Sequence, residues 1–194
     1  MKWNKELLDD YLAEKDRTVD TNEYLLMLEF INKTKPDIIL DVGTYKGASG
    51  YILKNNLSLA TVYSIDNTDS PNYYPKEEAT KEEHGMYLPK DVLFLKHGYE
   101  VHVPEIVEKN HGKKIFIFWD AGKNSFKVMN QIEMSYKYKI KYIAFHDSGK
   151  VQRTVRRAIK RAEQLGMYKI LKEDIESCPK KGLTILQLVW LVLG

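Results

Sequence analysis

Cysteine is nearly absent from the sequence, since Cys178 is the single cysteine among 194 residues. One cysteine cannot build an intramolecular disulfide framework or a cysteine-rich metal site. It fits a reducing compartment, so we expect a cytoplasmic protein. Long uncharged apolar runs are also missing. The C-terminal LTILQLVWLVLG is too short to span a bilayer, and the acidic, helical pattern of the N-terminal MKWNKELLDDYLAEKD is not that of a signal peptide. We therefore expect no membrane partner.

Two glycine signatures of phosphate binding are missing as well. The chain contains neither the Gly-x-Gly-x-x-Gly dinucleotide fingerprint nor the Gly-Lys-Ser/Thr of a Walker loop. The net charge of +3 and the pI of about 8.7 are too mild to indicate nucleic-acid binding by themselves. The glycines that are present must therefore serve a different purpose.

Apolar runs alternate with helical patterns from residue 38 onward, which predicts a single α/β domain over residues 1–194. Strands are predicted at 38–42, 61–65, 91–96, 114–119, 141–146, 167–171 and 183–190. Helices are predicted at 5–15 and 20–33, within an N-terminal segment 1–35, and at 47–55, 99–109, 124–138 and 151–165. Continuous apolar strands are typical of a parallel sheet covered on both faces. Because SCPKKGL is a turn, we expect a Rossmann-like, doubly wound, mostly parallel seven-stranded sheet with an antiparallel C-terminal hairpin.

A glycine-containing loop follows the first predicted strand. The strand ends at Asp41-Val42, the turn runs through Gly43–Gly47, and the next helix begins near Ala48. Gly43 permits a sharp turn and a close backbone approach to a ligand. In an open α/β sheet, ligands bind beyond the carboxyl ends of the strands, near the topological switch point. The loop is therefore predicted to carry a nucleotide-like ligand.

The acids at the strand ends narrow the choice of ligand. Asp66 ends the second strand, where its carboxylate can accept hydrogen bonds from both hydroxyls of a ribose. Asp41 ends the first strand and can meet a cationic group of the ligand. An adenosine-like ligand that carries a positive charge and no phosphate fits both acids, and S-adenosylmethionine is such a ligand.

Three segments, ILDVGTYKGASGYIL, YSIDN and FLKHGY, in this order, resemble the class I S-adenosylmethionine-dependent methyltransferases. The segment KTKPDIILDVG and the helix before it are similar to the small-molecule O-methyltransferase branch, and the resemblance extends from Thr21 to the C-terminal hairpin. It implies that the methionine part contacts Gly43, Thr44, Tyr45 and Gly47 with Ser49 nearby, the ribose contacts Asp66 and Asn67, and the adenine contacts His97, Gly98 and Tyr99. Asp41 and Asp120 complete the predicted cofactor-binding set.

A second group of polar residues follows the fourth and fifth strands. Asp120 ends the fourth strand, and His146 and Asp147 end the fifth, so these side chains should converge over the transferred methyl group. Asp120 and Asp147 can form the protein part of a Mg²⁺ site, in which the metal lowers the pKa of an acceptor hydroxyl. The proton would then pass to a base, for which Lys123 and His146 are the two candidates.

This arrangement resembles the catechol-type, metal-dependent O-methyltransferases. In their pattern an acid is followed three positions later by a lysine, which Asp120 and Lys123 match. Asp147 matches the aspartate of their Asp-Asn pair, but Ser148 stands in place of the asparagine, and Gly122 stands where many relatives have another acid.

The macrocin-type and cephalosporin-type relatives offer a second comparison. These relatives often have an acid followed by a histidine, and then His-Asp on the next strand. FHDSG is similar to the second part, whereas Lys123 and Asn124 occupy the region of the first histidine. Whether a metal is used therefore stays open.

Two other segments have two interpretations each. Residues 67–90 are long and polar and include Tyr73, Tyr74 and Tyr87, so they form either a lid over the substrate pocket or a solvated charged helix. The helix at 151–165 presents basic residues away from its apolar stripe, which form either a solvated face or a patch for nucleic acid or phosphate. Those basic residues are Arg153, Arg156, Arg157, Lys160 and Arg161. No aromatic residues interleave with them, which weakens the second interpretation.

The resemblance implies an enzyme that methylates a hydroxyl group of a small molecule. Two alternatives remain: a cofactor-binding module of this fold without catalysis, and a nucleic-acid methyltransferase. The sequence DAGK after the fourth strand does not resemble the Asn/Asp-Pro-Pro-Tyr motif of base methylation, so we expect no nucleic-acid partner. Apolar residues of the N-terminal helices could pair subunits into a homo-oligomer.

Overall fold

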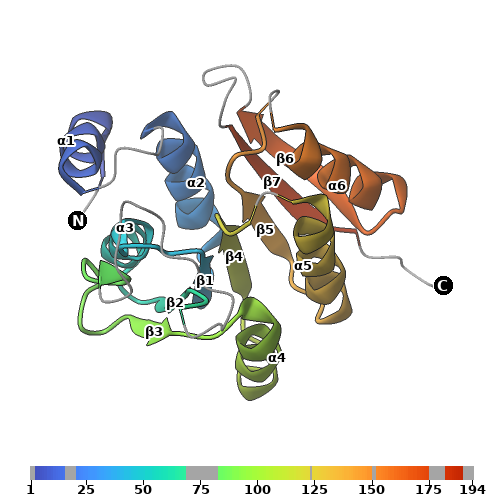
Figure 1. Ribbon diagram of the computed structural model, residues 1–194, viewed down its shortest axis with the longest axis horizontal. Helices are drawn as coiled ribbons and strands as arrows, with labels where there is room; N and C mark the ends of the chain where they lie inside the picture. The colour runs from blue at the N-terminus through green and yellow to red at the C-terminus, as the bar shows by residue number, and fades with distance from the viewer. Residues whose placement is uncertain are drawn as a thin grey trace.

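The computed structural model describes residues 3–15, 21–68, 83–122, 124–149, 152–174 and 182–189. A seven-stranded sheet in the order β3-β2-β1-β4-β5-β7-β6 runs through the molecule (Figure 1). Its strands are β1 (Ile38–Val42), β2 (Thr61–Ile65), β3 (Leu93–Leu95), β4 (Ile115–Trp119), β5 (Tyr142–Phe145), β6 (Tyr168–Asp174) and β7 (Leu183–Leu188). The first five strands pair in parallel, and β7 is antiparallel to both β5 and β6. The predicted fold class is confirmed.

Helices cover both faces of the sheet (Figure 1). They are α1 (Lys5–Lys15), α2 (Thr21–Thr34), α3 (Ala48–Asn56), α4 (Tyr99–Lys109), α5 (Ser125–Lys137) and α6 (Arg153–Gln164). Successive side chains of a strand point to opposite faces. Accordingly, Ile117 packs in the cluster with α4, α5 and α6, whereas Phe116 and Phe118 pack with α1, α2 and α3. This two-sided burial explains why the strands are continuously apolar.

The N-terminal helices are tied to the body of the domain by apolar and aromatic contacts. Trp3 donates a hydrogen bond from Nε1 to the carbonyl of Ile52 (3.1 Å), and Tyr11 stacks on Tyr51 with the ring centroids 4.9 Å apart. Apolar residues of α2, such as Met27 and Ile31, are buried in the chain's own core. Pairing of subunits through these helices stays a prediction.

Element boundaries differ from the predicted ones at the sheet edges. The strand β3 spans three residues instead of six, because it pairs only with β2 and its side chains are at most half-buried. At the other edge β6 extends to Asp174, with an irregularity between Ile170 and Lys172 in its pairing with β7. Of the predicted segment 67–90, residues 69–82, with Tyr73 and Tyr74, lie outside the described residues. Among the described helices, none has the length and apolarity needed to cross a membrane.

The topology places the predicted site at one edge of the sheet. The chain adds β2 and β3 on one side of β1 and then crosses to β4 on the other side. The carboxyl ends of β1, β2 and β4 therefore meet at a switch point, the usual ligand position in such sheets. Main-chain bonds continue past the strand ends there, from Gly43 to Ile65 (2.8 Å) and from Asp120 to Val42 (2.8 Å).

Candidate active site

Residues 43–47, which we call the glycine loop, require a glycine at position 43 for steric reasons. Its φ is +89°, and a Cβ at this position would lie 2.7 Å from the backbone of Asp120 and of Ala121. Gly43 therefore lets the loop after β1 turn while touching the loop after β4. This confirms the predicted sharp turn, and the backbone that approaches Gly43 is the protein's own.

Asp41, near the end of β1, links this strand to α3 and β2. Its side chain is fully buried, and Oδ2 accepts hydrogen bonds from the hydroxyls of Ser49 (2.9 Å) and Ser64 (3.1 Å). Burial raises the pKa of Asp41 to about 6, although the hydroxyl donors oppose this rise. The structure thus places Asp41 and Ser49 in an internal network, and a direct contact of either with the cofactor stays a prediction.

Asp66 reaches the other side of the loop. Its Oδ2 accepts a hydrogen bond from the main-chain N–H of Tyr45 (2.8 Å) and lies 3.1 Å from Nδ1 of His84. These contacts join the end of β2 to the loop after β1. They hold the Asp66 carboxylate at the mouth of the switch point.

A pocket opens at this edge of the sheet. It contains five of the predicted cofactor residues: Gly43, Asp66, Asn67, Gly98 and Tyr99. Its other lining residues, which were not among the predicted cofactor residues, are Val42, Ile65, Glu100, Trp119, Ala121, Gly122 and Lys127. Val42, Ile65 and Trp119 lie directly beside a strand-end acid in the sequence, which was the available signal for them, whereas Lys127 lies within α5 and had none.

An aromatic pair forms part of the pocket wall. Trp119 and Tyr99 meet edge to face with their ring centroids 4.7 Å apart. The Tyr99 hydroxyl donates a long hydrogen bond to the carbonyl of Lys127 (3.4 Å), and burial raises the pKa of Tyr99 to about 12. Tyr99 is therefore neutral at physiological pH and offers an apolar ring to the pocket.

The remaining predicted cofactor residues lie outside this pocket. Thr44 is buried, Tyr45 packs edge-on against His84, and Gly47 lies against Leu88. His97 is exposed and faces the ring of His102 at a centroid distance of 5.9 Å. For Thr44, Tyr45, Gly47 and His97 the cofactor contacts stay predictions.

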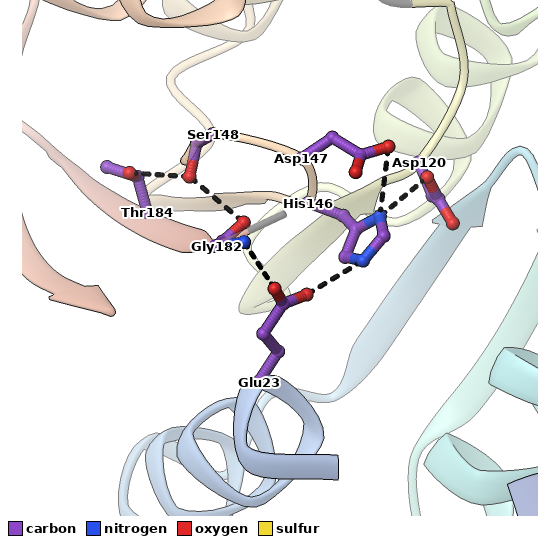
Figure 2. Close-up of polar contacts among 7 residues, drawn as sticks. All are labelled: Glu23, Asp120, His146, Asp147, Ser148, Gly182 and Thr184. Atoms are coloured by element: carbon purple, nitrogen blue, oxygen red, sulfur yellow. Dashed lines mark hydrogen bonds and ion pairs between the residues drawn. The ribbon is translucent and has the colours of Figure 1, made fainter. Parts of the chain in front are cut away.

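The second predicted group converges around His146 (Figure 2). Nδ1 of His146 lies 2.9 Å from Oδ1 of Asp120 and 3.4 Å from Oδ2 of Asp147, and Nε2 lies 2.7 Å from Oε2 of Glu23. The structure thus brings together Asp120, His146 and Asp147 from two neighbouring strands. Lys123, the other predicted base, lies outside the described residues.

The surrounding carboxylates determine the charge of His146. Burial by itself lowers the pKa of His146, but Asp120, Asp147 and Glu23 together raise it well above its ordinary value. The imidazole is consequently protonated at neutral pH and carries a proton on each nitrogen. In this arrangement Nδ1–H donates a hydrogen bond to Asp120 and the ring forms ion pairs with Asp147 and Glu23, so its predicted role as a base requires that it first lose a proton.

Glu23 is the residue of this cluster that the sequence did not single out. It belongs to α2, is 2% exposed, and also accepts a short hydrogen bond from the main-chain N–H of Gly182. The available signal was a glutamate four positions before Met27, on the apolar face of the helix. Fully buried glutamates are rare unless they are paired.

Ser148, which replaces the asparagine of catechol-type relatives, faces away from the acids. Its hydroxyl donates to the carbonyl of Gly182 (3.2 Å) and accepts from the hydroxyl of Thr184 (2.8 Å), as Figure 2 shows. Asn124, in the region of the missing histidine, caps α5 through hydrogen bonds from the N–H groups of Phe126 (2.9 Å) and Lys127 (3.0 Å). Both departures from the family patterns therefore have structural roles here.

Asp120, His146 and Asp147 also lie close enough together for a divalent-cation site, in which His146 could bind a metal only after losing a proton. One potential ligand atom from each residue lies within 4.8 Å of the other two. The two carboxylates suit Mg²⁺, which keeps several waters and needs few protein ligands. The Asp120 side chain is 27% exposed, whereas that of Asp147 is 6% exposed. The residues present fit a metal held mainly by Asp120.

Comparison with known proteins establishes the fold. No family model and no curated protein matches the sequence. Solved structures match over nearly the whole chain. The S-adenosylhomocysteine-bound methyltransferase PaMTH1 from Podospora anserina has a TM-score of 0.63 at 13% identity, covering 97% of this chain and 89% of that one. An O-methyltransferase from Bacillus cereus in complex with S-adenosylhomocysteine has a TM-score of 0.62 at 14% identity, and the match covers 96% of this chain and 92% of that one.

A third structure is similar over the same extent. The O-methyltransferase TomG from Streptomyces achromogenes, involved in tomaymycin synthesis and solved with S-adenosylmethionine, has a TM-score of 0.57 at 15% identity, covering 98% of this chain and 92% of that one. The protein therefore has the fold of the class I S-adenosylmethionine-dependent methyltransferases, as the resemblance of its sequence implied.

Proposed function

We propose that this protein is an S-adenosylmethionine-dependent methyltransferase that methylates a hydroxyl group of a small molecule. The observation that carries this proposal is the pocket at the switch point, where Asp66 and Gly43 lie together at the carboxyl ends of β1 and β2. Three solved structures that share the fold support it, because each is a complex with S-adenosylmethionine or S-adenosylhomocysteine.

In this proposal the pocket residues divide the cofactor between them. Asp66 and Asn67 receive the ribose hydroxyls, because an ionised carboxylate accepts several hydrogen bonds. The faces and edges of Trp119 and Tyr99 receive the adenine, since flat apolar surfaces suit a base. The loop that begins at Gly43 lies beside the methionine part. When bound, S-adenosylmethionine supplies a methyl group on a positively charged sulfur.

In this proposal the acid cluster, by which we mean Asp120, His146 and Asp147, binds the methyl acceptor. Asp120 and Asp147 hold the acceptor hydroxyl, either directly or through Mg²⁺, which would lower the pKa of that hydroxyl. His146, held as a cation, offsets the charge of the carboxylates and keeps them close together. Of the two predicted bases, this favours Lys123, whose neutral amine would accept the hydroxyl proton. Correct positioning of the hydroxyl supplies much of the rate in such a transfer.

The experiment that tests cofactor binding is calorimetric titration of the protein with S-adenosylhomocysteine. We expect micromolar binding by the wild type and a strong loss of affinity in Asp66→Asn, because the amide cannot accept from two hydroxyls as a carboxylate does. Asp91→Asn is the matched control, since Asp91 is exposed, pairs with Lys54 and does not line the pocket. Absence of binding to a protein shown to be folded would contradict the proposal.

The metal part is tested separately by thermal unfolding with and without Mg²⁺. A cation that binds the folded protein but not the unfolded chain stabilises the fold, so we expect Mg²⁺ to raise the unfolding midpoint of the wild type. Asp120→Asn should remove this response while the protein still folds and binds S-adenosylhomocysteine. If Mg²⁺ leaves the wild-type midpoint unchanged, the metal is excluded and the methyltransferase proposal stands without it.

A further inference from the structure

Residues 83–88, which we call the strap, are hydrogen-bonded to the glycine loop. Two main-chain hydrogen bonds join them: the N–H of Gly85 donates to the carbonyl of Tyr45, and that of Tyr87 to the carbonyl of Lys46, both at 2.8 Å. An ion pair between Lys46 and Glu83 (3.5 Å) adds a further contact. The strap is thus attached to the loop that the cofactor is proposed to contact.

Two glycines, Gly47 and Gly50, leave room for Leu88 of the strap. A Cβ on Gly47 would lie 2.8 Å from Cγ of Leu88, and a Cβ on Gly50 would lie 2.4 Å from Cδ2 of the same leucine. Leu88 therefore packs where side chains would otherwise project from the start of α3. Gly47 thus makes room for the strap, and its predicted contact with the cofactor stays a prediction.

His84 connects the strap to Asp66, the residue proposed to bind the ribose. Its side chain is 7% exposed, and its Nδ1 lies 3.1 Å from Oδ2 of Asp66. The N–H of Tyr45 donates to the same oxygen, and the Tyr45 ring meets the His84 ring edge-on. Two groups therefore hold Oδ2 of Asp66, and within the described part of the chain no hydrogen bond engages Oδ1, which can meet a ligand in the pocket that Asp66 lines.

We propose that the strap is part of the cofactor site, and that His84 is a positioning residue that orients the Asp66 carboxylate toward the ribose hydroxyls. The inference rests on the proposed function, because it assumes that Asp66 binds the ribose. Its physical reason is preorganisation: a carboxylate already held in its binding orientation loses less conformational freedom when the ligand arrives.

Two variants separate the hydrogen bond of His84 from its packing. His84→Phe keeps a ring against Tyr45 but has no donor for Asp66. His84→Asn loses the ring but places an amide nitrogen at the same number of bonds from Cα as Nδ1. By calorimetry with S-adenosylhomocysteine, we expect His84→Phe to raise the Kd about tenfold, as for a lost hydrogen bond to a charged group, and His84→Asn to stay close to the wild type.

The matched control is His111→Ala. His111 is exposed in the connection between α4 and β4, before the amino end of β4, whereas the pocket lies at the carboxyl ends of the strands. A double-mutant cycle adds a readout that a merely structural role would not move. If His84 acts through Asp66, His84→Phe should cost less affinity in an Asp66→Asn background than in the wild type.

Each outcome decides the inference. A wild type that binds while His84→Phe binds equally well, or more tightly, would overturn the role of His84 and leave the proposed function intact. Additive losses in the double mutant would also overturn it, because His84 would then act independently of Asp66. Failure of the folded wild type to bind would instead remove the proposed function, and the inference with it.

Discussion

At the scale of single residues, Asp41 shows how burial changes a strand-end acid. Its carboxyl has a folded pKa of about 6 against an ordinary value of 3.8, because the side chain is fully buried. A group whose pKa is raised by folding holds its proton more tightly in the folded state. Its contribution to stability is therefore greatest below pH 4 and is lost as the pH rises toward 6.

This sign leads to a prediction for Asp41→Asn. The asparagine oxygen can still accept from Ser49 and Ser64, but it never carries the buried charge. Between pH 4 and pH 7, the free energy of unfolding of the variant should rise relative to the wild type by about 2 kcal/mol. Urea unfolding of both proteins at the two pH values measures this change. A difference that is independent of pH would show that Asp41 titrates normally in the folded protein.

At the scale of elements, the junction of β1 with its loop depends on close backbone packing. Gly43 and Gly112 both have positive φ, but a Cβ on Gly43 meets the backbone at 2.7 Å, whereas a Cβ on Gly112 meets nothing within 4 Å. The two glycines therefore separate conformational strain from steric overlap.

We expect Gly112→Ala to cost about 1–2 kcal/mol of stability, the penalty of the left-handed conformation alone. Gly43→Ala should cost about 1–3 kcal/mol more, because the added methyl group also overlaps the loop after β4. Chemical denaturation of both variants gives the comparison. Equal losses would mean that the loops can separate without cost at this position.

The helix α2 is joined to the C-terminal hairpin by one buried glutamate. Glu23 contacts His146 at the end of β5 and Gly182 before β7, and its removal would leave a buried cation with one partner fewer. We expect Glu23→Ala to destabilise the fold by about 3 kcal/mol, as for a broken buried ion pair. Glu23→Gln, which keeps an acceptor, should cost less.

Glu29 of the same helix is the control for this experiment. Its side chain is 69% exposed and pairs with Lys172 at 3.2 Å. An exposed pair of this kind contributes about 0–1 kcal/mol. If Glu29→Ala and Glu23→Ala lowered the urea midpoint equally, the buried contact with His146 would have no special role in stability.

At the scale of the whole molecule, positive charge is concentrated on the outer face of α6. Arg153, Arg157 and Lys160 are exposed, whereas Arg156 turns inward, donating to the carbonyl of Ser148 (3.2 Å) and lying 3.6 Å from Glu173. One of the five basic residues in the predicted patch thus has a structural partner.

For this reason we expect no RNA binding at physiological ionic strength. The net charge is only +3, and binding to phosphates by a few exposed cations falls steeply with salt. Fluorescence anisotropy with a short labelled RNA measures this. Binding that persists at about 0.15 M salt and is lost in Arg157→Ala would instead support the nucleic-acid alternative.

The sequence by itself determined the order of the elements, the parallel sheet with its C-terminal hairpin, and the two groups of residues at the strand ends. These depend on local patterns: the spacing of apolar residues, the loop that begins at Gly43, and the position of acids such as Asp66 and Asp120 directly after a strand. Parallel strands then bring their carboxyl ends to one edge, whatever the details of packing.

Only the tertiary structure decided which of these residues face the pocket and which support it. Asp41 and Asp66 occupy similar places in the sequence, yet the first is buried and the second lines the pocket. The contacts of His84 with Asp66 and of Glu23 with Gly182 join residues 18 and 159 positions apart. The spacing of apolar residues in the sequence cannot predict such pairs, because they arise from how separate elements pack together and not from the pattern within any one element.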